Sequence, residues 1–168
     1  MDVKRAEASL LQEQKALQGQ VRTSEEQLRW FLDHTQAIVF IKDTAGRYKL
    51  INNRFESVFG LLRDETIGKQ DSALFPQELA QKFRQNDALV VEHGLSMKFE
   101  DPVPECNGPH TYFSVKFPIH DAEETLQGIG GISTDITERK RTEAERETLV
   151  SSLVMPMEPF HGHPNGAT

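Results

Sequence analysis

The residues best suited to covalent or metal chemistry are few and scattered in this sequence. Cys106 is the only cysteine among 168 residues, and its neighbours supply neither a second thiol nor an activating cation. His161 and His163 are the only closely spaced histidines, and two ligands in a tail rich in proline and glycine make a poor metal site. Paired carboxylates and a nucleophile beside a base are also missing from the pattern. We therefore expect no metal site and no enzyme activity in this chain.

Composition and charge narrow the classes of partner. The chain is 37% hydrophobic and 27% charged, which is typical of one globular domain with flanking segments. Its net charge is −7 and no basic stripe offsets it, so we expect no nucleic-acid partner. No apolar run approaches the roughly 18 residues that span a bilayer, and residues 1–5 lack the apolar stretch of a secretory signal. We expect a cytoplasmic protein without direct membrane contact.

The first thirty residues carry apolar side chains at heptad spacing, a pattern typical of a helix that faces a partner along one seam. Polar residues interrupt this seam, so the coil needs support from the neighbouring domain. We expect the flanking helices to form a parallel homodimer, because burying each large apolar side chain is worth roughly 1.5–3 kcal/mol. The seam residues assigned to this dimer are Leu10, Leu17, Val21, Leu28 and Phe31.

A break is expected within this helical region. Gly19 weakens a helix by about 1 kcal/mol relative to alanine. Thr23 and Glu26 then have the spacing of a capping box, which would begin a second helix. We expect that second helix to run from Ser24 to about His34.

The middle of the chain alternates between strand-like and helical patterns. Two short strand-like runs joined by a turn at residues 43–46 come first, and Asn52 and Asn53 then provide helix caps. Short helices follow, and a longer helix after Pro76 ends at Gly94. The order of elements excludes a regular parallel βαβ array and leaves an antiparallel sheet with helices on one side. The expected strands are 38–41, 48–51, 96–100, 111–119 and 126–134, with loops at 101–109 and 120–124.

The run from Gly128 to Arg141 resembles the end of a PAS domain, where a last strand passes through an Asp-Ile-Thr triplet into a C-terminal helix. The hairpin at 43–46 followed by residues 51–55 resembles the front of the same family. The resemblance covers about residues 25–140. It implies an α+β fold: a PAS-like five-stranded antiparallel sheet with helices on one face, flanked by N- and C-terminal signalling helices.

The same resemblance implies a role for the Asp-Ile-Thr junction. Taken as residues alone, Asp135 and Thr137 are simply suited to capping a helix. In PAS proteins this junction relays changes in the sheet to an output helix, and the aspartate commonly pairs with a basic residue nearby. The implied relay residues are Asp135, Thr137, Arg139 and Lys140, with Arg141 as a further candidate for the basic partner.

Residues that hold cofactors in PAS sensors are absent from the corresponding segments. Flavin photosensors carry a reactive cysteine in the stretch that corresponds to residues 67–75, and none is present here. Haem-binding members use a histidine within the long helix, but residues 78–92 contain none, and His93 lies at the helix end. We expect no tightly held cofactor. The sequence is compatible with a small exchangeable ligand, whereas non-covalent flavin or haem is the weaker expectation.

A cluster of aromatic residues has two interpretations that the sequence leaves open. A domain of this size needs such residues as its core. Alternatively, they line a pocket in which Arg84, Asn86 or Ser114 orients a small polar ligand. Alternation does not show which strand face points inward, because we expect the N-terminal helix to cover the outer face. The candidate ligand-binding residues are Phe40, Phe55, Phe59, Phe83, Arg84, Phe99, Phe113, Ser114 and Ile132.

Taken together, these patterns predict a sensory PAS module that couples ligand or partner sensing to coiled-coil helices. Such a module would be the input part of a histidine kinase, a diguanylate cyclase or a similar protein. The alternative is a cofactor-loaded redox, gas or light sensor. The expected segments are an N-terminal helix at 1–23, the PAS domain at 24–137, a C-terminal helix at 138–155 and a disordered tail at 156–168.

Overall fold

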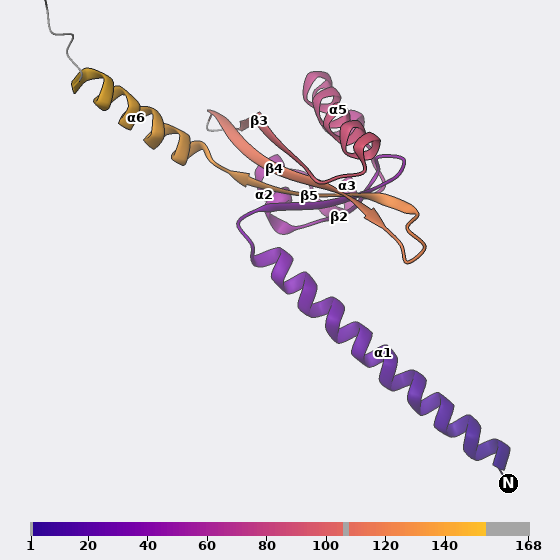
Figure 1. Ribbon diagram of the computed structural model, residues 1–168. Coiled ribbons are helices and arrows are strands. Elements are labelled where there is room, and N and C mark those ends of the chain that lie inside the picture. The colour runs from indigo at the N-terminus through magenta and orange to yellow at the C-terminus, as the bar shows by residue number, and fades with distance from the viewer. Residues whose placement is uncertain (1, 106–107, 154–168) are drawn as a thin grey trace, which may run out of the picture. The chain divides into compact units, whose positions relative to one another are not determined.

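The computed structural model describes residues 2–105 and 108–153. Its described part forms two compact units, which divide between Asp135 and Ile136. The first unit contains a five-stranded antiparallel sheet with the strand order β2-β1-β5-β4-β3 (Figure 1). The expected fold class is therefore confirmed. The strands are β1 (Ile38–Asp43), β2 (Tyr48–Ile51), β3 (Met97–Glu105), β4 (Gly108–His120) and β5 (Leu126–Asp135).

Four helices connect β2 to β3. Asn52 caps the first of them as expected, because its side chain accepts a hydrogen bond from the Phe55 amide, and α5 ends at the left-handed Gly94. Helix α2 contacts β1, and α5 contacts β3, β4 and β5, so both pack against the sheet (Figure 1). The four helices are α2 (Asn53–Phe59), α3 (Arg63–Thr66), α4 (Asp71–Leu74) and α5 (Gln77–His93).

Strand alternation places one face of the sheet toward these helices. Ile38, Phe40 and Lys42 of β1 are buried on this inner face, whereas the residues between them are only half-buried. The same period of two buries Tyr112 and Ser114 on β4. We call this surface the inner face and the opposite one the outer face.

Two glycines let aromatic rings lie directly on the central strand β5. A side chain at Gly131 would overlap the ring of Phe40, and one at Gly130 would meet the ring of Phe117 at 2.5 Å. Because β5 lies between β1 and β4, these rings cover it from its two neighbouring strands. The glycine run in β5 is therefore a packing requirement of the sheet.

Helix α1 (Asp2–His34) is continuous, so the expected break near Gly19 is wrong. Instead of capping a new helix, the Thr23 hydroxyl donates to the Gly19 carbonyl one turn earlier at 2.9 Å. One glycine costs too little to interrupt 33 residues that otherwise favour a helix. The five expected seam residues, Leu10, Leu17, Val21, Leu28 and Phe31, are all exposed.

The C-terminal end of α1 is joined to the domain through Asn52, which has no exposed surface. Its Nδ2 donates to the Leu32 carbonyl at 2.8 Å and to the Ala37 carbonyl at 2.9 Å. Its Oδ1 accepts from the amides of Val39 and Phe55. One buried amide therefore fixes α1, β1 and α2 to one another. The expectation that α1 covers the outer face is wrong, since Ile132 on that face is 42% exposed.

Strand β3 is longer than expected, because it continues through Pro102 and Pro104 into the segment assigned to a loop. Both prolines keep their register with β4, opposite Thr111 and Pro109. Proline is tolerated here because β3 is an edge strand, where one side of the backbone needs no ladder partner.

The second unit contains α6 (Thr137–Leu153), which is charged and exposed along its length. Arg139 Nε lies 3.8 Å from Glu143 Oε1 one turn later. The expected disordered tail at 156–168 and the last residues of the 138–155 segment lie outside the described residues. Among the described helices, none combines the length and apolar character needed to cross a membrane.

Candidate ligand site and its ion pairs

A small cavity lies between the inner face of the sheet and helices α2 and α5. Its volume is about 30 Å³, which is room for one or two water molecules. Five of the expected ligand residues meet there, namely Phe40, Phe55, Phe59, Phe83 and Ser114. The structure therefore brings most of the predicted aromatic cluster together around one enclosed space.

Four other expected residues lie elsewhere. Arg84 lines a separate open cleft beside α5. Phe99 is on the inner face, with its ring 5.9 Å from Lys116 Nζ, but it is not among the residues that line the cavity. Phe113 and Ile132 were expected inside and belong to the outer face, because each neighbours an inward serine in its strand. The sequence could not fix this parity, since both faces of β4 and β5 carry apolar residues.

Except for Ser114, the polar lining of the cavity was not predicted from the sequence. Lys42 and Lys116 both line it, although only 1% and 3% of their side chains are exposed. Tyr48, Asp101 and Ser133 also contribute. The available signal was the alternation itself, because Lys42 has the same parity in β1 as Phe40, and Lys116 the same parity in β4 as Ser114.

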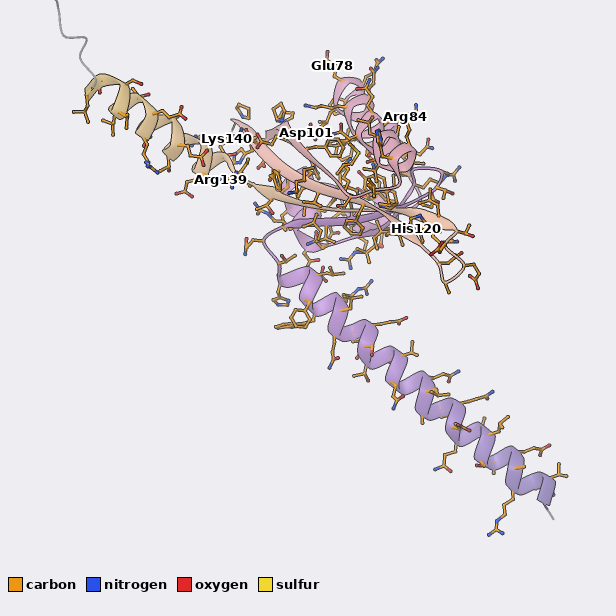
Figure 2. The ribbon with its side chains drawn as sticks, in the orientation of Figure 1. Glu78, Arg84, Asp101, His120, Arg139 and Lys140 are labelled. Atoms are coloured by element: carbon orange, nitrogen blue, oxygen red, sulfur yellow. The ribbon has the colours of Figure 1, made fainter. Side chains whose placement is uncertain are left out.

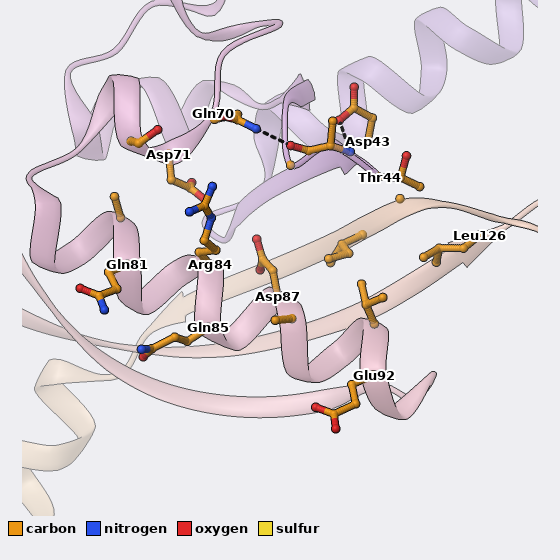
Figure 3. A pocket seen from close by; sticks show the side chains of 18 of the residues that line it. Asp43, Thr44, Gln70, Asp71, Gln81, Arg84, Gln85, Asp87, Glu92 and Leu126 are labelled. Atoms are coloured by element: carbon orange, nitrogen blue, oxygen red, sulfur yellow. Dashed lines mark hydrogen bonds between the residues drawn. The ribbon is translucent and has the colours of Figure 1, made fainter.

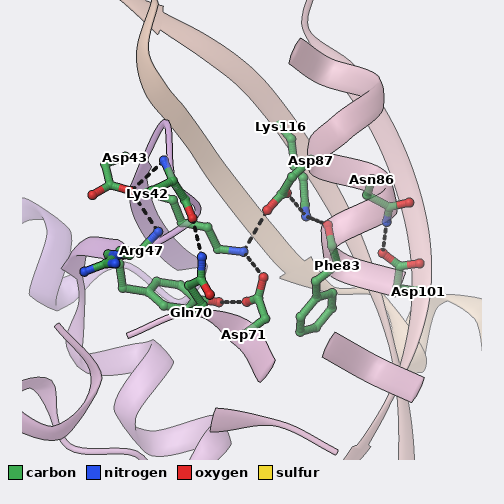
Figure 4. A network of polar contacts seen from close by, with 12 residues as sticks. Lys42, Asp43, Arg47, Gln70, Asp71, Phe83, Asn86, Asp87, Asp101 and Lys116 are labelled. Atoms are coloured by element: carbon green, nitrogen blue, oxygen red, sulfur yellow. Dashed lines mark hydrogen bonds and ion pairs between the residues drawn. The ribbon is translucent and has the colours of Figure 1, made fainter. Parts of the chain in front are cut away.

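The two lysines belong to a network of buried ion pairs that joins the sheet to α4 and α5 (Figure 4). Lys42 Nζ lies 2.6 Å from Asp71 Oδ2 and 2.8 Å from Asp87 Oδ2. Lys116 Nζ lies 2.5 Å from Asp87 Oδ1. The Tyr48 hydroxyl donates to Asp71 Oδ1 at 2.7 Å. Two cations therefore face two carboxylates, so the buried charges balance, as burial requires.

These contacts shift the titration of the groups involved. Burial alone would raise the pKa of Asp87, but Lys42 and Lys116 outweigh it and hold this pKa below its usual 3.8. Burial lowers the pKa of Lys116, although the adjacent Asp87 opposes the shift. Burial, followed by the charge of Asp71 and the hydrogen bond to it, raises the pKa of Tyr48 well above 10.0. Asp87 is therefore ionised and Tyr48 is neutral at physiological pH.

Two further contacts complete the polar part of the site. Asn86 Nδ2 donates to Asp101 Oδ2 at 2.9 Å, and Lys82 Nζ lies 2.9 Å from the other oxygen of this carboxylate. The hydroxyls of Ser114 and Ser133 share a hydrogen bond of 2.8 Å across β4 and β5. Asn86, which the sequence proposed as a ligand contact, is thus already engaged with β3.

The open cleft adjoins the two carboxylates of these ion pairs, and Figure 3 shows the side chains that line it. It has a volume of about 1150 Å³ and is lined by the 43–46 turn, α5 and the start of β5. Asp71 and Asp87 line this cleft, whereas Lys42 and Lys116 line the inner cavity. The ion pairs are therefore the partition between the enclosed cavity and the open cleft. Figure 2 shows Arg84 on α5, and Figure 3 shows its side chain in the cleft.

Two residues that the sequence analysis discusses, His93 and Asp135, lie outside the cavity lining and have contacts of their own. His93 is exposed, and its Nδ1 lies 2.9 Å from the Leu89 carbonyl at the end of α5. Asp135, at the end of β5, has an oxygen 2.7 Å from His110 Nδ1.

A comparison with known protein families identifies the family to which this arrangement of sheet and helices belongs. A family profile described as a PAS fold matches residues 32–141, which is well over half of the chain. The chain belongs to the PAS family. The match begins near the end of α1 and runs through the whole sheet to the start of α6.

The curated relatives include a regulatory histidine kinase and a sensor protein. The chain is 31% identical over 132 residues to the methanogenesis regulatory histidine kinase FilI of Methanothrix harundinacea, covering 77% of this chain and 15% of FilI. It is 28% identical over 115 residues to the aerobic respiration control sensor protein ArcB of Escherichia coli, covering 68% of this chain and 15% of ArcB. The chain thus spans about 15% of the length of each of these relatives, and it is homologous to a part of proteins that are named for regulation and sensing.

Solved structures extend the comparison. A VqmA structure bound to DPO has 28% identity and a TM-score of 0.59, covering 68% of this chain and 58% of VqmA. A Vibrio cholera VqmA–ligand–DNA complex has a TM-score of 0.62 at 24% identity, covering 80% of this chain and 61% of that one. The expectation that the chain has no nucleic-acid partner is therefore corrected. A PAS fold of this kind occurs in a protein solved with DNA, so an acidic balance does not exclude that class of partner.

Proposed function

We propose that this chain is the sensory segment of a larger signalling protein, in which a small ligand bound at the inner cavity changes the flanking helices. The observation that supports the proposal is the layer of ion pairs between the inner cavity and the open cleft. Lys42 and Lys116 belong to the sheet, whereas Asp71 and Asp87 belong to α4 and α5. A ligand that competes for either lysine loosens the attachment of these helices to the sheet, which gives binding a structural consequence.

The ligand class follows from the lining of the cavity. Phe40, Phe55 and Phe83 offer aromatic surface, while two ammonium groups and two serine hydroxyls supply polar contacts. This combination suits a small, flat molecule with hydrogen-bond acceptors or a carboxylate on its edge. Because a cavity of about 30 Å³ has room only for water, binding requires α5 to move outward, with the open cleft as the route of entry.

The absence of a tightly held cofactor is part of the same proposal. Flavin and haem are larger than the ligand class proposed above, so either would require a greater opening of this cavity of about 30 Å³. The missing cysteine in residues 67–75 and the missing histidine in residues 78–92 support the same inference. The absence of catalytic activity and the cytoplasmic location remain predictions from the sequence.

We propose that the chain forms a homodimer, because α1 has an exposed apolar seam. Its five seam residues are exposed in the single chain, and their heptad spacing fits a coiled coil with a second copy. Sedimentation of the full chain against a version lacking residues 1–23 tests this, and the truncated chain should dimerise more weakly. A full chain that stays monomeric at tens of micromolar, a range in which such modules associate, would contradict it.

A ligand screen tests the sensory proposal. Small heteroaromatic compounds and carboxylates are added to the full chain, and those that raise its melting temperature are titrated. Ser133→Ala should weaken their binding about 3- to 10-fold, because one hydrogen bond is lost. Thr134→Ala is the matched control, since the neighbouring residue is exposed on the outer face. Hits that Ser133→Ala leaves unchanged would place the binding site elsewhere.

A further inference from the structure

Three ligand-type side chains converge at the end of the sheet opposite the 43–46 turn. His110 Nδ1 lies 2.7 Å from Asp135 Oδ2 and 3.7 Å from Glu105 Oε1. All three residues are half-buried, and one potential ligand atom from each lies within 4.8 Å of the other two. This cluster differs from the expectation of no metal site, because the sequence alone does not show that these three residues meet.

The strand register explains why these residues meet. Asp135 of β5 is paired with Tyr112 of β4, and His110 lies two residues before Tyr112 on the same face. His110 is itself opposite Val103 of β3, so Glu105, two residues further, shares that face. Three adjacent strands therefore each direct one ligand-type side chain to one corner of the inner face.

Tyr112 holds one of these carboxylates in place. Its hydroxyl donates to Glu105 Oε1 at 2.7 Å. This hydrogen bond fixes the direction in which the Glu105 carboxylate faces. An outer hydrogen bond of this kind is the usual support of a metal-binding carboxylate.

We propose that Glu105, His110 and Asp135 bind one divalent transition-metal ion, for which Zn²⁺ is the natural probe. One imidazole nitrogen and two carboxylate oxygens form a three-ligand set that leaves a fourth position for water. Bonds of about 2.1 Å in a tetrahedral site place ligand atoms about 3.4 Å apart. The observed separations reach this arrangement by shifts on the order of 1 Å, in which the metal replaces the direct contact between His110 and Asp135. This site goes beyond the proposed ligand cavity and does not depend on it.

Its location gives metal binding a direct structural consequence. Asp135 is the last residue of β5 and carries the aspartate of the Asp-Ile-Thr junction. A metal ion would fix the ends of β3, β4 and β5 to one another at the residue where the first unit ends. Occupancy would therefore change how firmly the final strand is held.

The test is zinc binding by the full chain in a background where His161 and His163 are both changed to alanine, because those residues offer competing ligands. Calorimetry should show one Zn²⁺ per chain with a Kd of about 10 µM or tighter. His110→Ala should weaken binding by at least 10-fold. His120→Ala is the matched control, because this exposed histidine lies at the other end of the same strand and should leave the affinity unchanged.

Two further measurements keep the result decisive if a variant folds poorly. Glu105→Gln preserves an acceptor for Tyr112 and should still weaken Zn²⁺ binding. Co²⁺ added to the background chain should give the intense visible bands of a four- or five-coordinate site. Zn²⁺ affinity that is indifferent to both His110→Ala and Glu105→Gln would overturn the proposal. Co²⁺ that keeps the weak spectrum of the hydrated ion would do the same.

Discussion

Lys42 and Lys116 bind opposite oxygens of one carboxylate, that of Asp87, with Nζ–O distances of 2.8 and 2.5 Å. The two ammonium groups come from different strands, and Asp87 comes from α5. A single side chain of the helix therefore pairs with two cations of the sheet, and Asp71 supplies the second negative charge. Because the lysines also lie beside the rings of Phe40 and Phe83, the position of α5 and the shape of the cavity depend on the same contacts.

Asp87→Asn should destabilise the domain by about 3–5 kcal/mol, because it leaves two buried ammonium groups with too little opposing charge. Urea denaturation measures this change in the free energy of unfolding. Glu92→Gln is the control, since it makes the same chemical change at an exposed position of α5 and should cost little. Equal effects of the two substitutions would mean that the ion pairs contribute nothing specific.

The stabilising effect of Asp87 should also depend on pH. The folded pKa of this carboxyl is below its usual 3.8, so its contribution is complete above that value and is lost as pH falls through the folded pKa. The difference in unfolding free energy between the unmodified chain and Asp87→Asn should be constant from about pH 5 to 8 and shrink below about pH 4. A difference that grows as the pH falls would contradict this prediction, because it would mean that folding raises the pKa of Asp87.

Gly131→Ala should destabilise the sheet by about 1–3 kcal/mol, because the added methyl group overlaps the ring of Phe40. Thr134→Ala in the same strand provides the comparison, as its side chain is exposed. Thermal unfolding of both variants measures the effect. If Gly131→Ala is as stable as Thr134→Ala, Phe40 is free to move aside and the cavity is more adaptable than its packing indicates.

The purified chain should be colourless. Flavin and haem absorb between about 350 and 500 nm, and the residues and volume of the cavity favour neither. An absorbance spectrum after gel filtration measures this directly. A Soret band or a flavin doublet that survives the column would support the alternative of a cofactor-loaded sensor.

Asp135→Ala should leave the domain folded while changing hydrogen exchange in α6. Loss of one capping or pairing interaction costs about 0.5–2 kcal/mol, which a domain stable by about 5–15 kcal/mol tolerates. Thr137→Ala should act in the same direction. Substitutions of Arg139 and Lys140 then identify the basic partner, if one exists. Unchanged exchange in residues 138–153, or unfolding of the whole domain, would reduce the junction to a structural cap.

Much of the fold was predictable because local signals and tertiary structure agree. Asn52 caps α2 and Gly94 ends α5, as their residue types suggest. The resemblance carried by residues 128–141 supplied the class of sheet, five-stranded and antiparallel, whereas the strand order was not predicted. Where a local signal was weak, tertiary context prevailed: Gly19 did not interrupt α1, and Pro102 did not end β3.

The site was less predictable than the fold, because its chemistry depends on long-range pairing. Lysine is usually exposed, so the parity that Lys42 and Lys116 share with buried neighbours does not by itself predict their burial. Their burial becomes reasonable only when Asp71 and Asp87, from distant segments, are in place. The cluster of Glu105, His110 and Asp135 has the same origin, since it needs the register of three strands.

The two prolines of β3 also decide how the sheet meets other chains. Pro102 and Pro104 are two residues apart, so both turn the side that lacks an amide hydrogen away from β4. An incoming strand would find no donor at either position. The opposite edge is β2, which offers only four residues. Strand addition is therefore hindered along the second half of β3 and limited by the short length of β2, two devices that discourage edge-to-edge aggregation.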